Sequence, residues 1–154
     1  MKKVKQFLSI ALVIGAGFAG VELAQAEEKI DIVVNRSPTC SCCGKWIEHL
    51  KQNNFNVKDV VSDDVRAVKT KYGVSQELAS CHTAVVNGYV VEGHVPANDI
   101  KTLLKNKPSV VGISVPGMPM GTPGMEMGGK KDVYQVVSFN KNNQTQVFNS
   151  YSAE

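Results

Sequence analysis

Three of the four cysteines in this chain of 154 residues lie in the segment 40–43, which reads Cys-Ser-Cys-Cys. The preceding residues 29–34 contain the β-branched run that is typical of a buried strand. Apolar residues then recur with helical spacing from Cys43 to Leu50, which predicts a helix that begins within the motif and ends near Asn53. The sulfurs are therefore expected at a helix N-terminus, where backbone N–H groups and the helix dipole favour thiolate.

The N-terminal segment has the composition of an export signal. Lysines are concentrated in the first five residues, a mainly apolar run extends from Phe7 to Gly20, and Ala24-Gln25-Ala26 matches a cleavage site. We therefore expect residues 1–26 to be a signal peptide and residues 27–154 to form a single periplasmic domain. The apolar run is short for a membrane span and no second run follows, so no span is expected once the signal is removed.

Charge and cysteine spacing exclude several classes of function. The formal net charge is only +3 and much of it belongs to the signal, so nucleic acid is a poor candidate partner. In an oxidising compartment the four cysteines could form two structural disulfides, but adjacent Cys42 and Cys43 bond only with strain. A bond from Cys40 to Cys42 or Cys43 closes too small a loop to constrain the unfolded chain. A bridge to Cys81 would leave two clustered thiols, so we interpret the cysteines as reactive or metal-binding.

The remaining pattern predicts an α/β fold. Its expected elements are a strand at 55–61, a helix from the Ser62-Asp63-Asp64 cap to Gly73, a hairpin at 83–91, and a helix from Pro96 to Asn106. The resulting order, β-α-β-α-β-β-α, is the thioredoxin arrangement, in which the sulfur loop occupies the position of the C-x-x-C motif. We therefore predict a thioredoxin-like domain, followed by a loop rich in Met, Gly and Pro and by a C-terminal hairpin at 134–139 and 145–148.

The register of the predicted hairpin places the fourth cysteine, Cys81. If Asn87-Gly88 forms a two-residue turn, Cys81 lies opposite His94, with His82 beside both. In the thioredoxin arrangement this strand begins beside the C-x-x-C loop and usually carries a cis-proline, which is absent here. Cys81 and His94 are therefore expected to converge on the Cys40–Cys43 loop. For His82, a role in the site and the role of an ordinary polar residue at a strand end are equally compatible with the sequence. A bulge at Gly93 that shifts the register would turn His82 inward in place of His94.

A methionine-rich loop is the second unusual feature of the chain. Residues 116–128 are rich in glycine and proline and hold four of the five methionines. Methionine usually fills cores, but such a loop cannot bury all four against a regular face. Thioether sulfur beside thiolate sulfur is the ligand set that selects Cu(I), so we predict a copper site that holds one or more ions. The candidate ligands are Cys40, Cys42, Cys43, Cys81, His94, Met118, Met120, Met125 and Met127. His49, on the first helix, is expected to face solvent and to take no part.

Four segments of the chain resemble a known family, the CopG-type periplasmic copper-resistance and metal-binding proteins, long catalogued as a domain of unknown function. The segments are 38–46, with Pro-Thr-Cys-x-Cys-Cys-x-x-Trp, 78–84, 88–96 and 115–126. The resemblance implies a thioredoxin-like domain that binds copper through Cys40, Cys42 and Cys43 and takes part in copper redox handling. Its partners would be copper ions and other periplasmic copper-handling proteins. Sequestration of Cu(I) and electron transfer between copper and a disulfide fit these residues equally well, so enzyme activity stays open.

Two other functions compete with copper binding. One is a thiol–disulfide oxidoreductase that uses Cys40 and Cys43, with metal incidental. The missing cis-proline and the unexplained methionine loop argue against it. The other is an interaction module stapled by disulfides, which a count of free thiols would expose.

Overall fold

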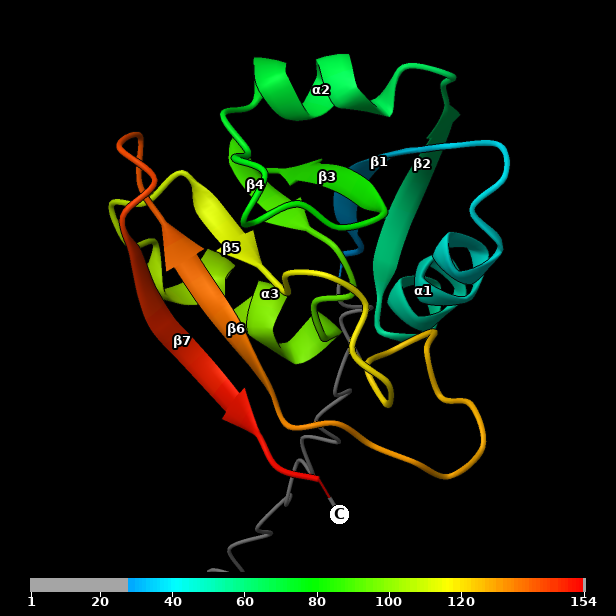
Figure 1. Ribbon diagram of the computed structural model, residues 1–154. Coiled ribbons are helices and arrows are strands. Elements are labelled where there is room, and N and C mark those ends of the chain that lie inside the picture. Colours follow the sequence, from blue (N-terminus) through cyan, green and yellow to red (C-terminus); the bar gives the residue numbers. More distant parts are fainter. Residues whose placement is uncertain (1–27, 154) are drawn as a thin grey trace, which may run out of the picture.

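The computed structural model describes residues 28–153, so the expected signal peptide lies outside the described residues. Its elements are β1 (Ile30–Arg36), α1 (Ser41–Gln52), β2 (Phe55–Val61), α2 (Val65–Lys71), β3 (His82–Val86), β4 (Tyr89–Glu92), α3 (Ala97–Asn106), β5 (Gly112–Ser114), β6 (Tyr134–Phe139) and β7 (Thr145–Tyr151). The predicted order of elements is confirmed, with one strand added (Figure 1). Within the described part, no helix has the length and apolar character to cross a membrane.

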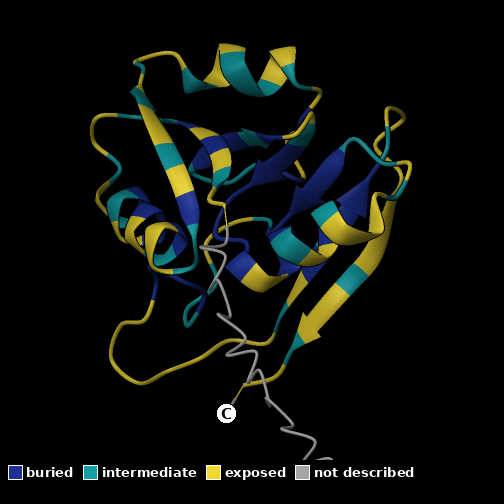
Figure 2. Cartoon of the chain, turned by 180° about the vertical axis from the view of Figure 1, so that it is seen from behind, coloured by how far each residue is buried: buried dark blue, intermediate teal, exposed yellow. Residues whose placement is uncertain are grey.

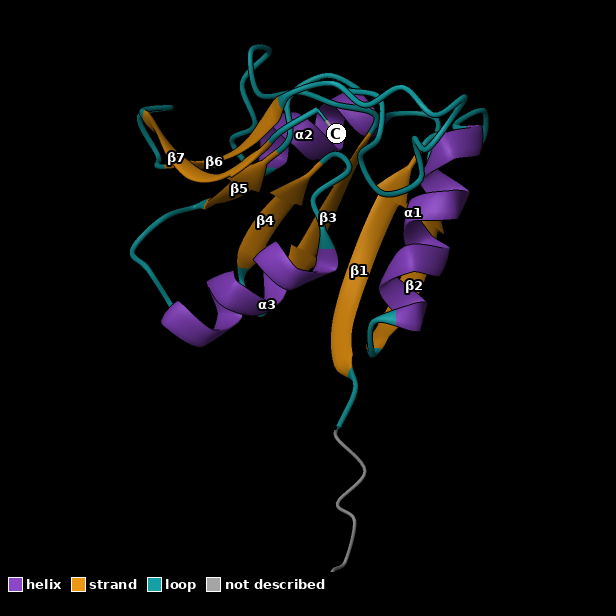
Figure 3. Ribbon diagram, turned by 90° about the horizontal axis from the view of Figure 1, so that it is seen from below, coloured by secondary structure: helices purple, strands orange, loops and turns teal. Residues whose placement is uncertain are grey.

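All seven strands form one mixed sheet in the order β2-β1-β3-β4-β5-β6-β7. β1 runs parallel to β2, whereas β3 is antiparallel to both β1 and β4, which gives the thioredoxin-like half of the sheet. Seen from below in Figure 3, α1 flanks β1 and β2 while α3 lies beside β4. In Figure 1, α2 lies on the opposite side of the sheet from these two helices.

The strand missing from the sequence analysis is β5. It has three residues, and a run of that length carries no periodic signal that distinguishes a strand from a loop. β5 pairs parallel with β4 and antiparallel with β6, so it joins the predicted C-terminal hairpin to the thioredoxin-like strands. The hairpin is consequently an extension of the central sheet.

The main core lies between the sheet and the helices α1 and α3. It is formed by apolar residues that include Trp46 and Leu50 of α1, Ile100 and Leu103 of α3, and inward residues of the inner strands. A smaller cluster, around Val90 and Phe139, lies on the other face. Figure 2 shows the burial of the inner strands, in contrast to the largely exposed edge strands β2 and β7. The sulfur motif therefore begins a helix that the core fixes firmly in place.

Prediction for Gly93. This residue ends the β3–β4 hairpin with φ +75°, and a Cβ there would lie 2.6 Å from both Ser80 and the Val115 carbonyl oxygen. Gly93→Ala is expected to lower the free energy of unfolding by about 3 kcal/mol, because left-handed strain and overpacking add. Gly88→Ala is the matched control, since Gly88 has φ +83° but open space around it, and should cost about 1 kcal/mol. Urea unfolding of both variants measures the difference, and equal losses would contradict the close packing at Gly93.

Candidate metal centre

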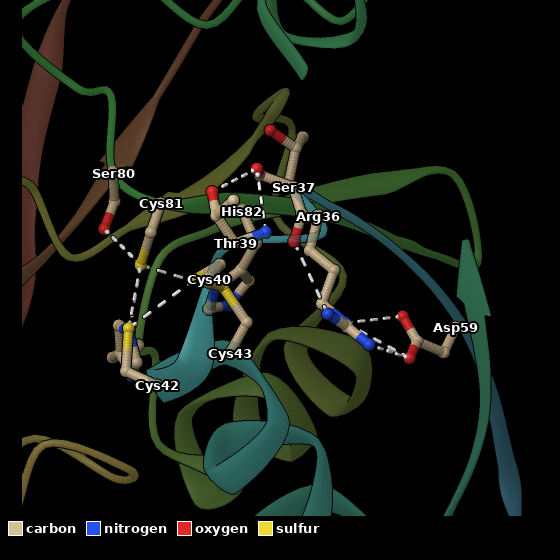
Figure 4. Close-up of a disulfide and its surroundings, with 12 residues drawn as sticks. Arg36, Ser37, Thr39, Cys40, Cys42, Cys43, Asp59, Ser80, Cys81 and His82 are labelled. Carbon is tan, nitrogen blue, oxygen red and sulfur yellow. Dashed lines mark hydrogen bonds and ion pairs between the residues drawn. A yellow bond between two sulfur atoms is a disulfide. The ribbon is translucent and has the colours of Figure 1, made fainter. Parts of the chain in front are cut away.

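Four cysteines from two parts of the chain meet at one end of α1. Cys40 is the N-cap of α1, Cys42 and Cys43 follow in its first turn, and Cys81 directly precedes β3. The Cys42 Sγ lies 3.6 Å from the Cys40 Sγ and 3.9 Å from the Cys81 Sγ, and all four sulfurs lie within 4.8 Å of one another. Figure 4 shows Cys81 reaching toward the motif from the start of β3. The predicted convergence of Cys81 on the Cys40–Cys43 loop is therefore confirmed.

Two of these cysteines are bonded to each other. Cys40 and Cys43 form a disulfide with a Cα–Cα distance of 5.5 Å, whereas Cys42 and Cys81 are free thiols (Figure 4). The spacing of these cysteines argued against this bond as a structural staple, because the loop that it closes is too small to constrain the unfolded chain. Its spacing is that of an exchangeable C-x-x-C pair. Consequently two thiols are available in this state, and reduction of the disulfide by two electrons frees all four.

Burial controls the ionisation of Cys81. The pKa of the Cys81 thiol is raised to about 11, mainly by desolvation; the neighbouring Cys42 sulfur acts in the same direction, whereas a hydrogen bond with Ser80 opposes the shift. The metal-free protein therefore carries Cys81 as a protonated thiol at neutral pH. A metal that binds there must displace this proton.

His94 presents one ring nitrogen to Cys81. The β3–β4 register pairs Val86 with Tyr89 and Thr83 with Glu92, as predicted from the Asn-Gly turn. If the same register is extended by two residues, Cys81 lies opposite His94. The His94 Nε2 does lie 3.0 Å from the Cys81 Sγ. The His94 Nδ1 lies 2.7 Å from the Pro123 carbonyl oxygen, which can only accept, so Nδ1 carries the proton.

The environment of His94 favours the neutral imidazole. Burial lowers the pKa of His94, although the Pro123 hydrogen bond and Glu126 act in the opposite direction. Its Nε2 lone pair therefore faces Cys81 while a backbone carbonyl holds the ring from behind. Metal-binding histidines are commonly oriented by a carbonyl or carboxylate in this way.

His82 is also directed inward. Its ring is fully buried, with its centroid 4.2 Å from that of Trp46 and 5.0 Å from that of His94. The Nδ1 atom lies 3.7 Å from the Cys81 Sγ, while Nε2 is buried without a hydrogen-bond partner among the described residues. Burial holds the pKa of His82 well below its usual range. The hairpin register predicted that His94 turns inward, or His82 if a bulge shifts the register, whereas the structure brings both beside Cys81.

The expectation that His49 faces solvent is wrong. His49 is half-buried, and its Nε2 accepts a hydrogen bond of 3.1 Å from the backbone N–H of Ala97, the first residue of α3. Burial lowers its pKa, which favours the neutral ring that this contact requires. The physical reason is the packing of α1 beside the start of α3, which helical spacing within α1 does not reveal.

The methionine loop passes directly over the start of α1. A Cβ at Gly124 would lie 2.8 Å from the Trp46 nitrogen and 3.1 Å from the Cys42 carbonyl oxygen, so this close approach needs glycine. The Pro123 carbonyl one residue earlier is the group that holds His94. The four methionines have different exposures: Met125 is buried, Met120 half-buried, and Met118 and Met127 are 54% and 50% exposed. The loop does not bury all four, as predicted.

A buried ion pair, which the sequence analysis missed, fixes the residue before Cys81. Glu92 is fully buried and forms a salt bridge with Lys69 of α2. Its carboxylate also accepts hydrogen bonds from the Ser80 backbone N–H, at 2.7 Å, and from the Thr83 hydroxyl, at 2.6 Å. The sequence feature that could have revealed this ion pair is an acidic residue directly after two apolar strand residues, Val90 and Val91. Because Ser80 is tied to Glu92, Cys81 has little freedom to move away from the other sulfurs.

Prediction for Cys81 reactivity. In the Cys42→Ser variant Cys81 is the only free thiol, and desolvation, the largest cause of its raised pKa, remains although the smaller contribution of Cys42 is lost. Alkylation by iodoacetamide at pH 8 should therefore be at least about 10-fold slower in the native protein than in urea, and should accelerate at a higher pH than for an ordinary thiol. Mass spectrometry follows the reaction, with Cys81→Ser as the control that leaves only Cys42. Equal rates in native and unfolded protein would refute the burial of this thiol.

Comparison with known proteins identifies relatives of this chain. A family model described as "Protein of unknown function, DUF411" matches residues 78–125, the part that contains Cys81, His94 and most of the methionine loop. No curated protein matches. Two solved structures, both called copper resistance protein CopG and distinguished as form 1 and form 2, are each 48% identical with a TM-score of 0.77. The match to form 1 covers 81% of this chain and the match to form 2 covers 80%. Each match covers 99% of the solved chain. This chain therefore belongs to the CopG family of copper resistance proteins.

Proposed function

We propose that the reduced protein binds Cu(I) in the periplasm, at a site formed by Cys40, Cys42, Cys43, Cys81 and His94, and that this binding serves copper resistance. One observation carries the proposal: four sulfurs and an imidazole nitrogen, from segments far apart in sequence, converge beside one helix end. The relatives named for copper resistance support the choice of metal.

The donor set fits copper in its reduced state. Thiolates are soft ligands that select Cu(I), and imidazole is compatible with copper. Thiolate sulfur also bridges metal ions, so four sulfurs within 4.8 Å of one another support more than one ion. Copper would supply the redox chemistry, while the protein supplies the orientation of His94 through Pro123 and the placement of Cys81 through Ser80 and Glu92.

The methionines extend the site outward in this proposal. Met125 is the best candidate for a thioether ligand, because it is buried and follows Gly124, which lies against the start of α1. Met118 and Met127 remain half-exposed and Met120 is intermediate, so these three are suited to a first encounter with copper at the surface. Thioether ligands keep their affinity in an oxidising compartment, where thiols are lost to disulfides.

The Cys40–Cys43 disulfide makes copper binding dependent on redox state. While this bond is present, only Cys42 and Cys81 offer thiols. Two electrons convert the disulfide into two further thiolate ligands. The same two cysteines can therefore either hold copper or hold a disulfide, which links copper loading to reduction.

Prediction for metal selectivity. Reduced protein should bind Cu(I) several orders of magnitude more tightly than Zn(II), and protein with the Cys40–Cys43 disulfide intact should bind fewer copper ions. Competition against a coloured Cu(I) chelator measures both. His94→Ala should weaken binding at least about 10-fold. Ser41→Ala, at an exposed position inside the motif, is the control expected to change nothing. Preferential retention of zinc by the reduced protein would overturn the copper assignment.

A thiol–disulfide oxidoreductase is the second candidate, favoured by the disulfide itself. It joins Cys40, at the helix N-cap, to the buried Cys43, which is the arrangement of an exchangeable C-x-x-C pair. Against this reading, residues 28–153 contain no cis peptide bond, and Ser80-Cys81-His82 occupies the place where thioredoxins carry cis-proline. A plain C-x-x-C oxidoreductase also exchanges disulfides through its pair alone, so it does not account for the free Cys42.

Prediction for Cys42. If the protein is a plain oxidoreductase, Cys42→Ser should leave exchange with an external disulfide substrate nearly intact, because Cys40 and Cys43 remain. If the protein binds copper through the cluster, the same variant should lose at least about 10-fold in Cu(I) affinity, or part of its copper stoichiometry. Chelator competition and a dithiol oxidation assay on the same preparation separate the two. Unchanged copper binding together with full exchange activity would favour the oxidoreductase.

A further inference from the structure

We propose that the protein undergoes an internal thiol–disulfide exchange, in which its disulfide moves from the Cys40–Cys43 pair to a new pair, Cys42–Cys81. This activity goes beyond copper binding and requires no metal. The free Cys42 thiol is the nucleophile, and Cys81 is the thiol that completes the transfer. The outcome is a covalent bridge between α1 and the start of β3.

The positions of the sulfurs carry this inference. Cys42 lies between the disulfide and the second free thiol, with its Sγ 3.6 Å from the Cys40 Sγ and 3.9 Å from the Cys81 Sγ. Both separations are close to the contact distance of two sulfur atoms. Cys40, Cys42 and Cys81 are also partly accessible, whereas Cys43 is fully buried. The three accessible sulfurs therefore form a continuous path from the C-x-x-C disulfide to β3 (Figure 4).

The first step opens the existing disulfide. The Cys42 thiol loses its proton to solvent, and its thiolate attacks the Sγ of Cys40, forming a Cys40–Cys42 bond. The Cys40–Cys43 bond breaks, and Cys43 leaves as a thiolate that takes up a proton. Attack at Cys40 is favoured, because a bond between the adjacent Cys42 and Cys43 is strained. The leaving thiolate lies in the first turn of α1, where the helix dipole stabilises negative charge.

The second step transfers the bond to β3. The Cys81 thiol loses its proton to solvent, and its thiolate attacks the Sγ of Cys42, forming the Cys42–Cys81 disulfide. The Cys40–Cys42 bond breaks, and Cys40 leaves as a thiolate that takes up a proton. One disulfide and two thiols are present before and after the reaction, so no external oxidant or reductant is consumed. The tie between Ser80 and the buried Glu92 keeps Cys81 within reach during both steps.

Transfer changes which cysteines are free. Before it, Cys42 and Cys81 are the free thiols; afterwards, Cys40 and Cys43 form a reduced C-x-x-C pair at a helix N-terminus. That pair can accept a second disulfide from a disulfide-donating partner, while the first is stored at Cys42–Cys81. The new bridge joins residues 39 apart in sequence, a loop long enough to constrain the unfolded chain. The protein can thus hold two disulfides at one site, taken up one after the other.

A disulfide-mapping experiment tests the exchange. Copper-free protein with one disulfide and two titratable thiols is incubated without oxygen at pH 8, quenched in acid and treated with N-ethylmaleimide. Trypsin cuts after Arg36, Lys45, Lys71 and Lys101, so the motif and Cys81 fall on separate peptides. Transfer predicts a growing disulfide link between peptide 37–45 and peptide 72–101, with N-ethylmaleimide on Cys40 and Cys43. Protein that keeps only the Cys40–Cys43 bond, while an added small disulfide exchanges with its thiols, would overturn the proposal.

Two variants identify the nucleophile. Cys42→Ser should slow the appearance of the link at least about tenfold, because Cys81 must then attack the disulfide directly. The double variant with Ser41→Cys and Cys42→Ser keeps the number of thiols but moves one to the exposed neighbouring position, and should stay equally slow. A wild-type rate in either variant would refute the role of Cys42. The assay contains no copper, so its failure leaves the copper proposal untouched, and a failure to bind copper leaves the exchange untouched.

Discussion

Trp46 holds together the segments that build the sulfur site. Its indole N–H donates a 2.9 Å hydrogen bond to the Val95 carbonyl, next to His94, while its ring packs against the ring of His82. Its backbone nitrogen lies where a Cβ on Gly124 of the methionine loop would clash. One fully buried side chain therefore connects the first turns of α1 with three other segments of the site. Its large apolar surface stabilises the core, and its one polar group fixes the orientation of the segments around it.

The site also depends on a charge placed in the interior. An unpaired buried carboxylate would be strongly destabilising, but each oxygen of Glu92 has a partner: Lys69 and the Ser80 N–H on one, and the Thr83 hydroxyl on the other. The arrangement connects α2, the turn before Cys81 and both strands of the hairpin. Apolar packing is non-directional, whereas these bonds have a defined geometry. They are thus suited to hold one sulfur at a fixed distance from others on a different element.

The sequence contained the information for the layout of this site but not for all of its contacts. Strand, loop and helix around Cys40 followed from local periodicity, and the Asn87-Gly88 turn fixed a register that paired Cys81 with His94. The contact of His49 with Ala97 depends on how two helices pack, and no local pattern encodes it. β5 is too short to carry a period. Whether Cys40 bonds to Cys43 depends on redox state, which spacing alone does not specify.

The contact between Cys81 and His94 stabilises the metal-free site and suits the proposed copper site. In the metal-free protein the half-buried Cys81 keeps its proton and lies 3.0 Å from the unprotonated Nε2 of His94, so the thiol donates to the imidazole and both polar groups are satisfied. A bound cation would replace that single proton between the same two atoms. The Pro123 carbonyl already holds His94 in the tautomer that both states need, so neither tautomer nor ring orientation has to change. Under the proposed copper binding, the protein would lose protons, Cys40 and Cys43 would gain two electrons, and the sulfur and nitrogen atoms would separate slightly to admit the ion.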